Sequence, residues 1–201
     1  MPRWIILAVF SLLLLVPVSS LAKKKAPKPL VLEGVAADFR DAAGELAADQ
    51  VKALKVAGRC VQDDRIWARE MENREPVTQT YETLAGAVVC WQGAEKKAGK
   101  VEGSFAAATR LIGARARYVE TLRSFYFALT EKFRTGADGQ RLCDRLKVAL
   151  GEAGAANDLG ADLAAVFTNE AAKTMAAQLD ADIKHWGEVV AAEFKHQKCS
   201  E

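Results

Sequence analysis

The chain has 201 residues, of which 50% are hydrophobic and 27% charged, so it is long enough for one domain with a sizeable core and too short to argue for two. Its formal charge of +2 is misleading, because five of its basic residues precede Leu30: Arg3, Lys23, Lys24, Lys25 and Lys28. From Leu30 onward, 23 Lys and Arg stand against 26 Asp and Glu, which is a charge of −3 and argues against a nucleic-acid-binding domain.

The first 22 residues have the layout of a secretory signal peptide. Arg3 precedes an apolar run over residues 4–16, and Pro17 and the small residue Ala22 follow it. An alternative stays open, because residues 4–22 are nearly long enough to span a bilayer and would anchor the chain in the inner membrane if they were left uncleaved. In either case we expect the rest of the chain to lie outside the cytoplasm of a bacterium, in the periplasm or secreted.

Residues 23–29 form a basic, Pro-containing leader, and residues 30–201 are predicted to form a single helical domain. Alanine is abundant there and proline is absent after Pro76, as is typical of a chain that is helical almost throughout. The first helix is predicted to begin near Leu32 and to run to about Asn73. Its end is ambiguous, because residues 62–75 are highly charged around a lone aromatic and fit either a solvated helix end or a loop.

A second helix is predicted from Val77 to Trp91, with Pro76 at a position favoured in the first turn of a helix. The third covers Val101 to Phe133, where ten positions spaced four and three apart are apolar except for Arg115. That spacing is typical of coiled-coil and bundle helices. At 1.5 Å per residue this helix is about 50 Å long, so we expect an elongated molecule.

Gly136 and Asp138 are predicted to end the third helix and to begin a fourth. The fourth helix is expected to be short and to stop near Gly154. The last is expected to restart at Asn157, with a kink near residues 168–169. Its apolar stripe consists of Leu179, Ile183, Trp186, Val190 and Phe194.

These elements predict an all-α fold. Because consecutive helices joined by short loops lie antiparallel, we expect an elongated up-and-down bundle of four long helices and one short one, held by two disulfides.

The four cysteines all lie beyond the signal sequence, and in an oxidising compartment they are expected to form two disulfides. If the first hairpin turns near Glu75, Cys60 and Cys90 are each fifteen residues from the turn and lie at the same height in an antiparallel pair. We therefore predict a bridge between Cys60 and Cys90, which leaves Cys143 with Cys199. Four cysteines allow three pairings, and the spacing favours this one without excluding the others.

The ten spaced positions form the apolar seam of the third helix, and Arg115 is the one charge in it. We single Arg115 out as a possible contact for an anionic ligand or a partner. Its neighbours Arg110, Arg117 and Arg123 form a basic flank on the same helix, and Trp67 is the aromatic of the charged stretch. Each also has a plain structural interpretation. Arg115 could pair with a carboxylate or extend its charge to solvent, and the flank could be a solvated face.

No residue pattern indicates a catalytic, metal or cofactor site. His185 and His196 each follow an Asp or Glu by three residues, a pattern that di-iron bundles use to bind metal. Both patterns lie on the last helix, about 16 Å apart, which is too far to share a metal ion. We therefore expect His185 and His196 to be surface residues. Cys-x-x-Cys pairs and phosphate-binding glycine loops are absent from the sequence. We therefore expect no cofactor and no enzyme activity. A catalytic pair of carboxylates brought together only by the fold would, however, leave no motif in the sequence.

The sequence thus predicts an exported helical bundle that acts as a protein interaction or structural module. The partner is an unknown protein or a second copy of the chain. The alternative is a carrier or sensor that binds a small ligand between helices near Arg115.

Overall fold

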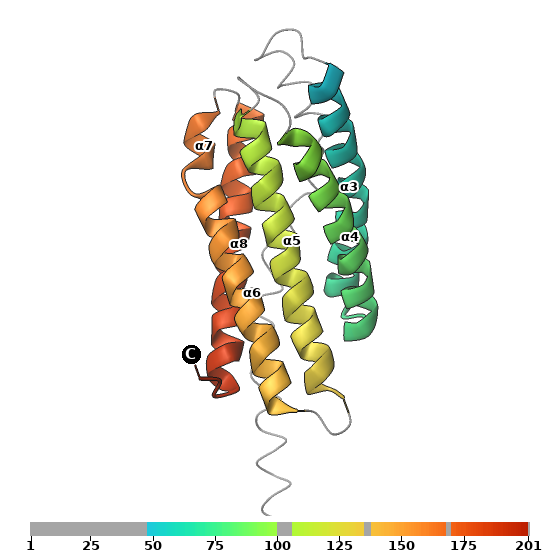
Figure 1. Cartoon of the computed structure of the whole chain (residues 1–201), viewed down its shortest axis with the longest axis vertical. Helices are drawn as coiled ribbons and strands as arrows, with labels where there is room; N and C mark the ends of the chain where they lie inside the picture. Colours follow the sequence, from blue (N-terminus) through green and yellow to red (C-terminus); the bar gives the residue numbers. More distant parts are fainter. Residues whose placement is uncertain (1–47, 100–105, 135–137, 168–169, 201) are drawn as a thin grey trace, which may run out of the picture.

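The computed structural model describes residues 48–99, 106–134, 138–167 and 170–200. Outside these ranges lie the predicted signal peptide, the basic leader, the start of the first predicted helix, the start of the third at Val101 and the predicted helix end at Gly136. Within them every regular element is a helix, and Figure 1 shows the long ones running side by side in alternating directions along one axis. The predicted all-α, up-and-down bundle is confirmed.

Helices α3 (Ala48–Asn73) and α4 (Val77–Ala98) form an antiparallel hairpin. The charged stretch of residues 62–75 is therefore helical up to Asn73, where α3 ends. Arg74 adopts a left-handed backbone, with φ of 57°, and Pro76 precedes the first residue of α4. A left-handed residue after the last helical turn followed by a proline is a common way for a helix to end. Pro76 caps α4 from outside instead of occupying its first turn, a difference of one residue.

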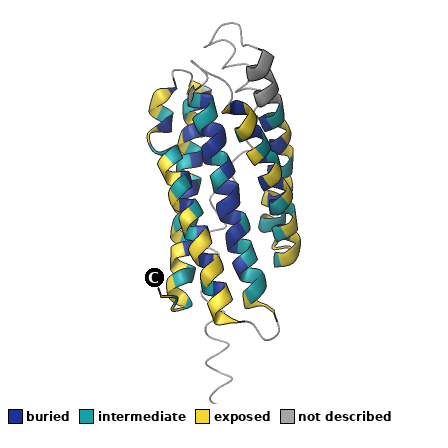
Figure 2. Ribbon diagram, in the orientation of Figure 1, coloured by how far each residue is buried: buried dark blue, intermediate teal, exposed yellow. Residues whose placement is uncertain are grey.

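Helix α5 (Ala106–Lys132) is the central element of the bundle. It packs against α4 on one side and α6 on the other, and it also contacts α7 and α8. Every residue over 107–131 is buried or half-buried, as the dark and teal segments of Figure 2 show for this helix. The predicted seam accounts for part of this burial. Its last member, Phe133, follows the end of the helix and is 70% exposed, so the seam was extended too far.

The fourth helix is longer than predicted. Helix α6 (Gly139–Gly160) has 22 residues and passes through Gly154, which is exposed and has open space around it. A glycine inside a helix costs about 1 kcal/mol relative to alanine, and here packing of the opposite face outweighs that cost. The predicted cap is confirmed, because the Asp138 side chain accepts a hydrogen bond from the backbone N–H of Gln140.

The last helix begins later than predicted. A short helix, α7 (Leu163–Val166), follows α6, and α8 (Glu170–His196) begins only after it. The predicted kink at residues 168–169 lies outside the described ranges. The apolar stripe of α8 is confirmed: Leu179, Ile183 and Val190 are buried, and Trp186 and Phe194 are half-buried.

Two disulfides hold the bundle, one within its first hairpin and one at the end of the chain. Cys60 of α3 bonds to Cys90 of α4 with their Cα atoms 5.5 Å apart, and Cys143 of α6 bonds to Cys199 just after α8, with a Cα separation of 5.4 Å. Both predicted pairings are confirmed. The first bridge fixes the register of the α3–α4 hairpin, and the second ties the end of the chain to α6.

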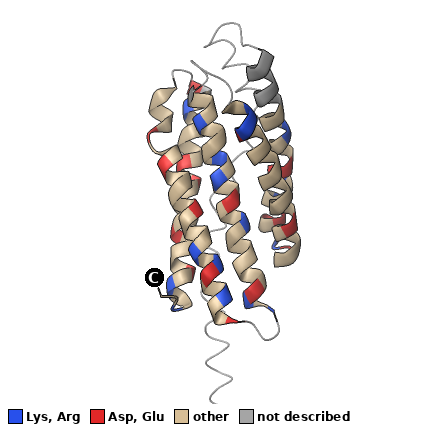
Figure 3. Ribbon diagram, viewed as in Figure 1, with Lys and Arg blue, Asp and Glu red and all other residues tan. Residues whose placement is uncertain are grey.

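Among the described residues, no helix is long and apolar enough to cross a membrane. Figure 3 shows positively and negatively charged residues interspersed along the helices.

Candidate functional site

The carboxylate of Asp64 is the centre of a buried polar cluster. Asp64 lies on α3 and is 6% exposed. Its Oδ1 accepts hydrogen bonds from the indole N–H of Trp67, at 2.9 Å, and of Trp91, at 3.0 Å. Its Oδ2 accepts from Nε and Nη2 of Arg115, at 3.0 and 2.9 Å. A carboxylate offers about four lone-pair sites, so these four donors satisfy it completely.

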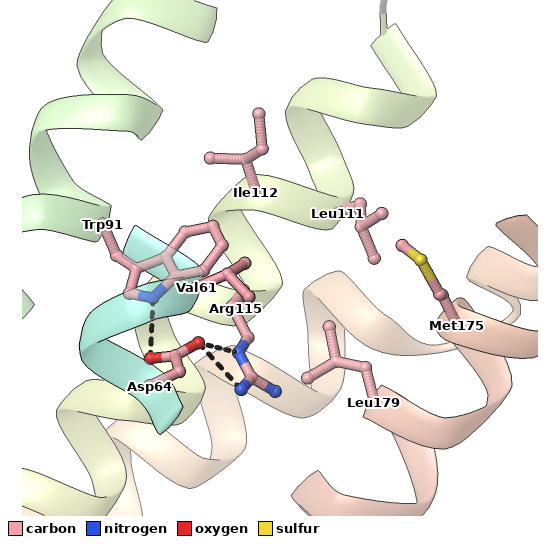
Figure 4. Close-up of a pocket in the computed structure, with 8 residues that line it drawn as sticks. All are labelled: Val61, Asp64, Trp91, Leu111, Ile112, Arg115, Met175 and Leu179. Atoms are coloured by element: carbon pink, nitrogen blue, oxygen red, sulfur yellow. Dashed lines mark hydrogen bonds and ion pairs between the residues drawn. The ribbon is translucent and has the colours of Figure 1, made fainter. Parts of the chain in front are cut away.

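The cluster joins three helices. Trp67 comes from α3, Trp91 from α4 and Arg115 from α5, and Figure 4 shows the last two converging on Asp64. The helical register explains the local part of this arrangement. Cys60, Asp64 and Trp67 are spaced four and three apart and therefore share one face of α3, the face that packs against α4 and α5.

Aromatic rings flank the guanidinium of Arg115. Its Cζ is 5.0 Å from the ring centroid of Tyr118 and 5.9 Å from that of Trp67. These distances suit cation–π contacts, which strengthen where water is excluded. Burial lowers the pKa of Arg115, but the charge of Asp64, together with smaller effects of Tyr118, the Asp64 hydrogen bonds and Asp182, outweighs burial, so the pKa lies above its usual value and the guanidinium stays charged. Burial raises the pKa of Tyr118, so its phenol stays neutral.

A small cavity adjoins the cluster. It measures about 20 Å³, which is room for a single water molecule. In Figure 4 the third guanidinium nitrogen of Arg115 points away from Asp64, toward Leu179 of α8. The cavity walls are mostly apolar, and its lining residues are Val61, Asp64, Trp91, Leu111, Ile112, Arg115, Met175 and Leu179.

The structure brings together only two of the five residues singled out from the sequence, Arg115 and Trp67. The side chain of Arg110, on α5, reaches the end of α6, where its guanidinium donates to the backbone carbonyls of Leu159 and Ala161. A cation at this position satisfies carbonyls that the helix leaves unpaired and interacts favourably with the helix dipole. Its role is therefore to cap α6.

The rest of the predicted basic flank is neutralised within the bundle. Arg117 pairs with Glu152 of α6 at 3.3 Å. Arg123 pairs with Glu120 three residues earlier on α5, a carboxylate that is only 8% exposed. The flank is thus a set of internal ion pairs and not a continuous basic surface.

Sequence reasoning missed Asp64 and Trp91. Asp64 lies in the charged stretch of residues 62–75, which hides that it occupies the same helix face as Cys60 and Trp67. One signal could have paired Asp64 with Arg115. Each is a charged residue on the buried face of its helix, and the two charges are opposite.

The residues considered for metal or cofactor binding are not gathered into a site. His185 and His196 are exposed on α8. Within the described ranges, no group of three or more His, Cys, Asp and Glu side chains is arranged to hold a metal ion. What the structure shows at Asp64 is a carboxylate whose hydrogen bonds are all used to hold three helices together.

In comparisons with known proteins, the chain matches no protein-family model, no curated protein and no solved structure.

Proposed function

We propose that this protein is an exported helical bundle that acts as a protein interaction or structural module. The signal-like layout of residues 1–22 and the two disulfides support export, because disulfides persist in oxidising compartments outside the cytoplasm. Uncleaved, the same segment would anchor the bundle to the inner membrane.

The observation that carries the proposal is the way α3 is attached to the bundle. One face of α3 is fixed by the Cys60–Cys90 disulfide and by the hydrogen bonds of Asp64. Its opposite face is exposed, including Ile66 at 52%. A helix that is held rigidly along one side loses little conformational entropy when a partner binds the other side, which favours a docking role.

Crosslinking in intact cells tests this function. The full chain, carrying an affinity tag at its C-terminus, is treated with a short amine-reactive crosslinker and then captured under denaturing conditions. We expect a discrete adduct with another protein or with a second copy of the chain. A chain that is recovered only as uncrosslinked monomer at its native abundance would count against the proposal.

A second candidate function is binding of a small ligand beside Arg115. The cavity next to the Asp64 cluster marks the place, because it combines apolar walls with a guanidinium nitrogen directed away from Asp64. At about 20 Å³ it holds a single water molecule, so the helices would have to move apart to admit a ligand. Asp64 already neutralises Arg115, so a neutral molecule suits this place better than an anion. Native mass spectrometry of the purified chain tests this function. A bound mass that disappears on denaturation, and that is absent from Leu179→Trp, supports it, whereas a ligand-free spectrum contradicts it.

A further inference from the structure

Over residues 56–73 of α3, most of the exposed charges are positive. Three arginines, Arg59, Arg65 and Arg69, are exposed. The carboxylates of residues 63–72 are mostly less exposed: Asp64 is buried, Asp63 and Glu70 are half-buried, and only Glu72 is exposed, near the end of the helix. The exposed face is therefore basic, although the stretch as a whole carries both signs.

The three arginines have no carboxylate partner among the described residues, unlike Arg115, Arg117 and Arg123 of α5. Glu70, which lies close to Arg69 in sequence, instead accepts hydrogen bonds from Gln79 and Thr83 of α4. These bonds hold the Glu70 carboxylate toward the hairpin interior. The guanidinium groups of the exposed face are thus available to charges from outside the chain.

We propose that Arg59, Arg65 and Arg69, with Ile66 between them, form a docking surface for an acidic helical segment of another protein. This inference rests on the proposed interaction function and names its surface and its partner class.

The spacing of the arginines suits a helical partner. They follow one another by about 9 Å and about 6 Å along the axis of α3, at 1.5 Å per residue. Carboxylates one turn apart on a helix have the second of these spacings, so a partner helix lying along α3 can present Asp or Glu to successive arginines. Ile66 supplies an apolar contact in the middle of the surface, where exclusion of water strengthens the surrounding ion pairs.

Two other anionic partners fit less well. A membrane surface would require an apolar face, but Ile66 is the only large hydrophobic side chain of α3 that is exposed in the described part of the chain. A nucleic acid would meet a domain whose overall charge from Leu30 onward is −3.

A peptide titration tests the surface directly. The probe is a fluorescently labelled amphipathic peptide that carries glutamates one and two turns apart on one helical face, with a leucine between them. We expect it to bind the full chain more weakly as salt is raised, because these ion pairs are exposed. The variant R59Q/R65Q/R69Q is expected to lose about tenfold in affinity.

A matched variant controls for the change in net charge. K147Q/K195Q/K198Q removes three exposed positive charges on α6 and at the end of α8, and we expect it to bind the peptide as the wild type does. Equal binding by the arginine variant and the wild type would overturn the proposal. So would arginine-dependent binding to vesicles containing phosphatidylglycerol that exceeds peptide binding, or arginine-dependent self-association in sedimentation velocity.

Photo-crosslinking in cells separates failure of this surface from failure of the function. A photoreactive amino acid replaces Ile66 on α3, or Val148, which is 48% exposed on α6. We expect adducts from position 66 that require the three arginines and that map to an acidic helix of the partner. Adducts from position 148 alone would retain the interaction function and reject this surface. An absence of adducts at both positions, together with a monomer in the amine-reactive experiment, would reject both.

Discussion

Arg115 of α5 and Asp64 of α3 form an ion pair across 51 residues of sequence, with Nη2 and Oδ2 separated by 2.9 Å and both side chains largely shielded from solvent. Because Trp67 and Trp91 donate to the same carboxylate, the pair is part of a network and its members should not act independently.

We predict that single substitutions in this pair are costly and that their effects are not additive. Asp64→Asn leaves a buried guanidinium without its counter-charge, and we expect a loss of about 3–5 kcal/mol in the free energy of unfolding. Arg115→Met should also destabilise the protein. The double variant should be at least 1 kcal/mol more stable than the sum of the two single effects implies. Urea denaturation of all four proteins measures the coupling, and additive effects would show that the pair is not a unit.

The two arginines that contact α6 should differ in importance. Arg110 donates to carbonyls at the end of α6, so Arg110→Met leaves charge-assisted hydrogen bonds unmade and should cost about 1.5–3 kcal/mol. Arg117 makes a single ion pair with its own side chain 41% exposed, and Arg117→Met should cost less than about 1 kcal/mol. Hydrogen exchange distinguishes the mechanisms, because only the Arg110 variant should lose protection selectively in the last turn of α6. Equal costs would contradict the capping role.

Much of the fold could be predicted from sequence because its signals are local. The four-three spacing of apolar residues identified the long helices, and counting residues from Glu75 gave the Cys60–Cys90 bridge. The length of α6 could not be predicted in this way, because Gly154 indicates a stop locally while buried Ala153 and Ala156 on either side pack the helix against the bundle. Arg115 was recognisable as unusual from its seam position. Its partner was not, since the contact depends on how α3 and α5 are placed in space.

The Cys60–Cys90 bridge should stabilise the α3–α4 hairpin more than the rest of the protein. For a sequence separation of 30, chain entropy predicts a loss of about 3.5 kcal/mol in Cys60→Ser/Cys90→Ser. Hydrogen exchange should increase in α3 before it increases in α6. Cys143→Ser/Cys199→Ser, with a separation of 56, is the comparison and should instead loosen the end of α8. Uniform loss of protection in both variants would mean that neither bridge acts locally.

Asp182 and Glu193 of α8 should give opposite pH dependences. Burial raises the pKa of Asp182, despite opposing effects of Gln178, Arg115 and His185, so its ionisation destabilises the folded state. Asp182→Asn should therefore raise the Tm at pH 7. This gain should shrink as the pH falls through the raised pKa of the folded state toward the usual value of 3.8, because the native carboxyl is then protonated as well.

For Glu193, burial raises the pKa, but the hydrogen bonds from Lys132 and Gln197 and the charges of Lys132 and His196 together outweigh burial and hold the pKa below its usual value of 4.5. Its stabilising effect is therefore present above 4.5 and is lost as the pH falls through the lowered pKa of the folded state. Glu193→Gln should lower the Tm at pH 7 and have little effect below that pKa. Thermal unfolding of both variants from acid to neutral pH measures the two profiles. Profiles of the same sign would show that the charge of one of these residues is not coupled to folding as its surroundings imply.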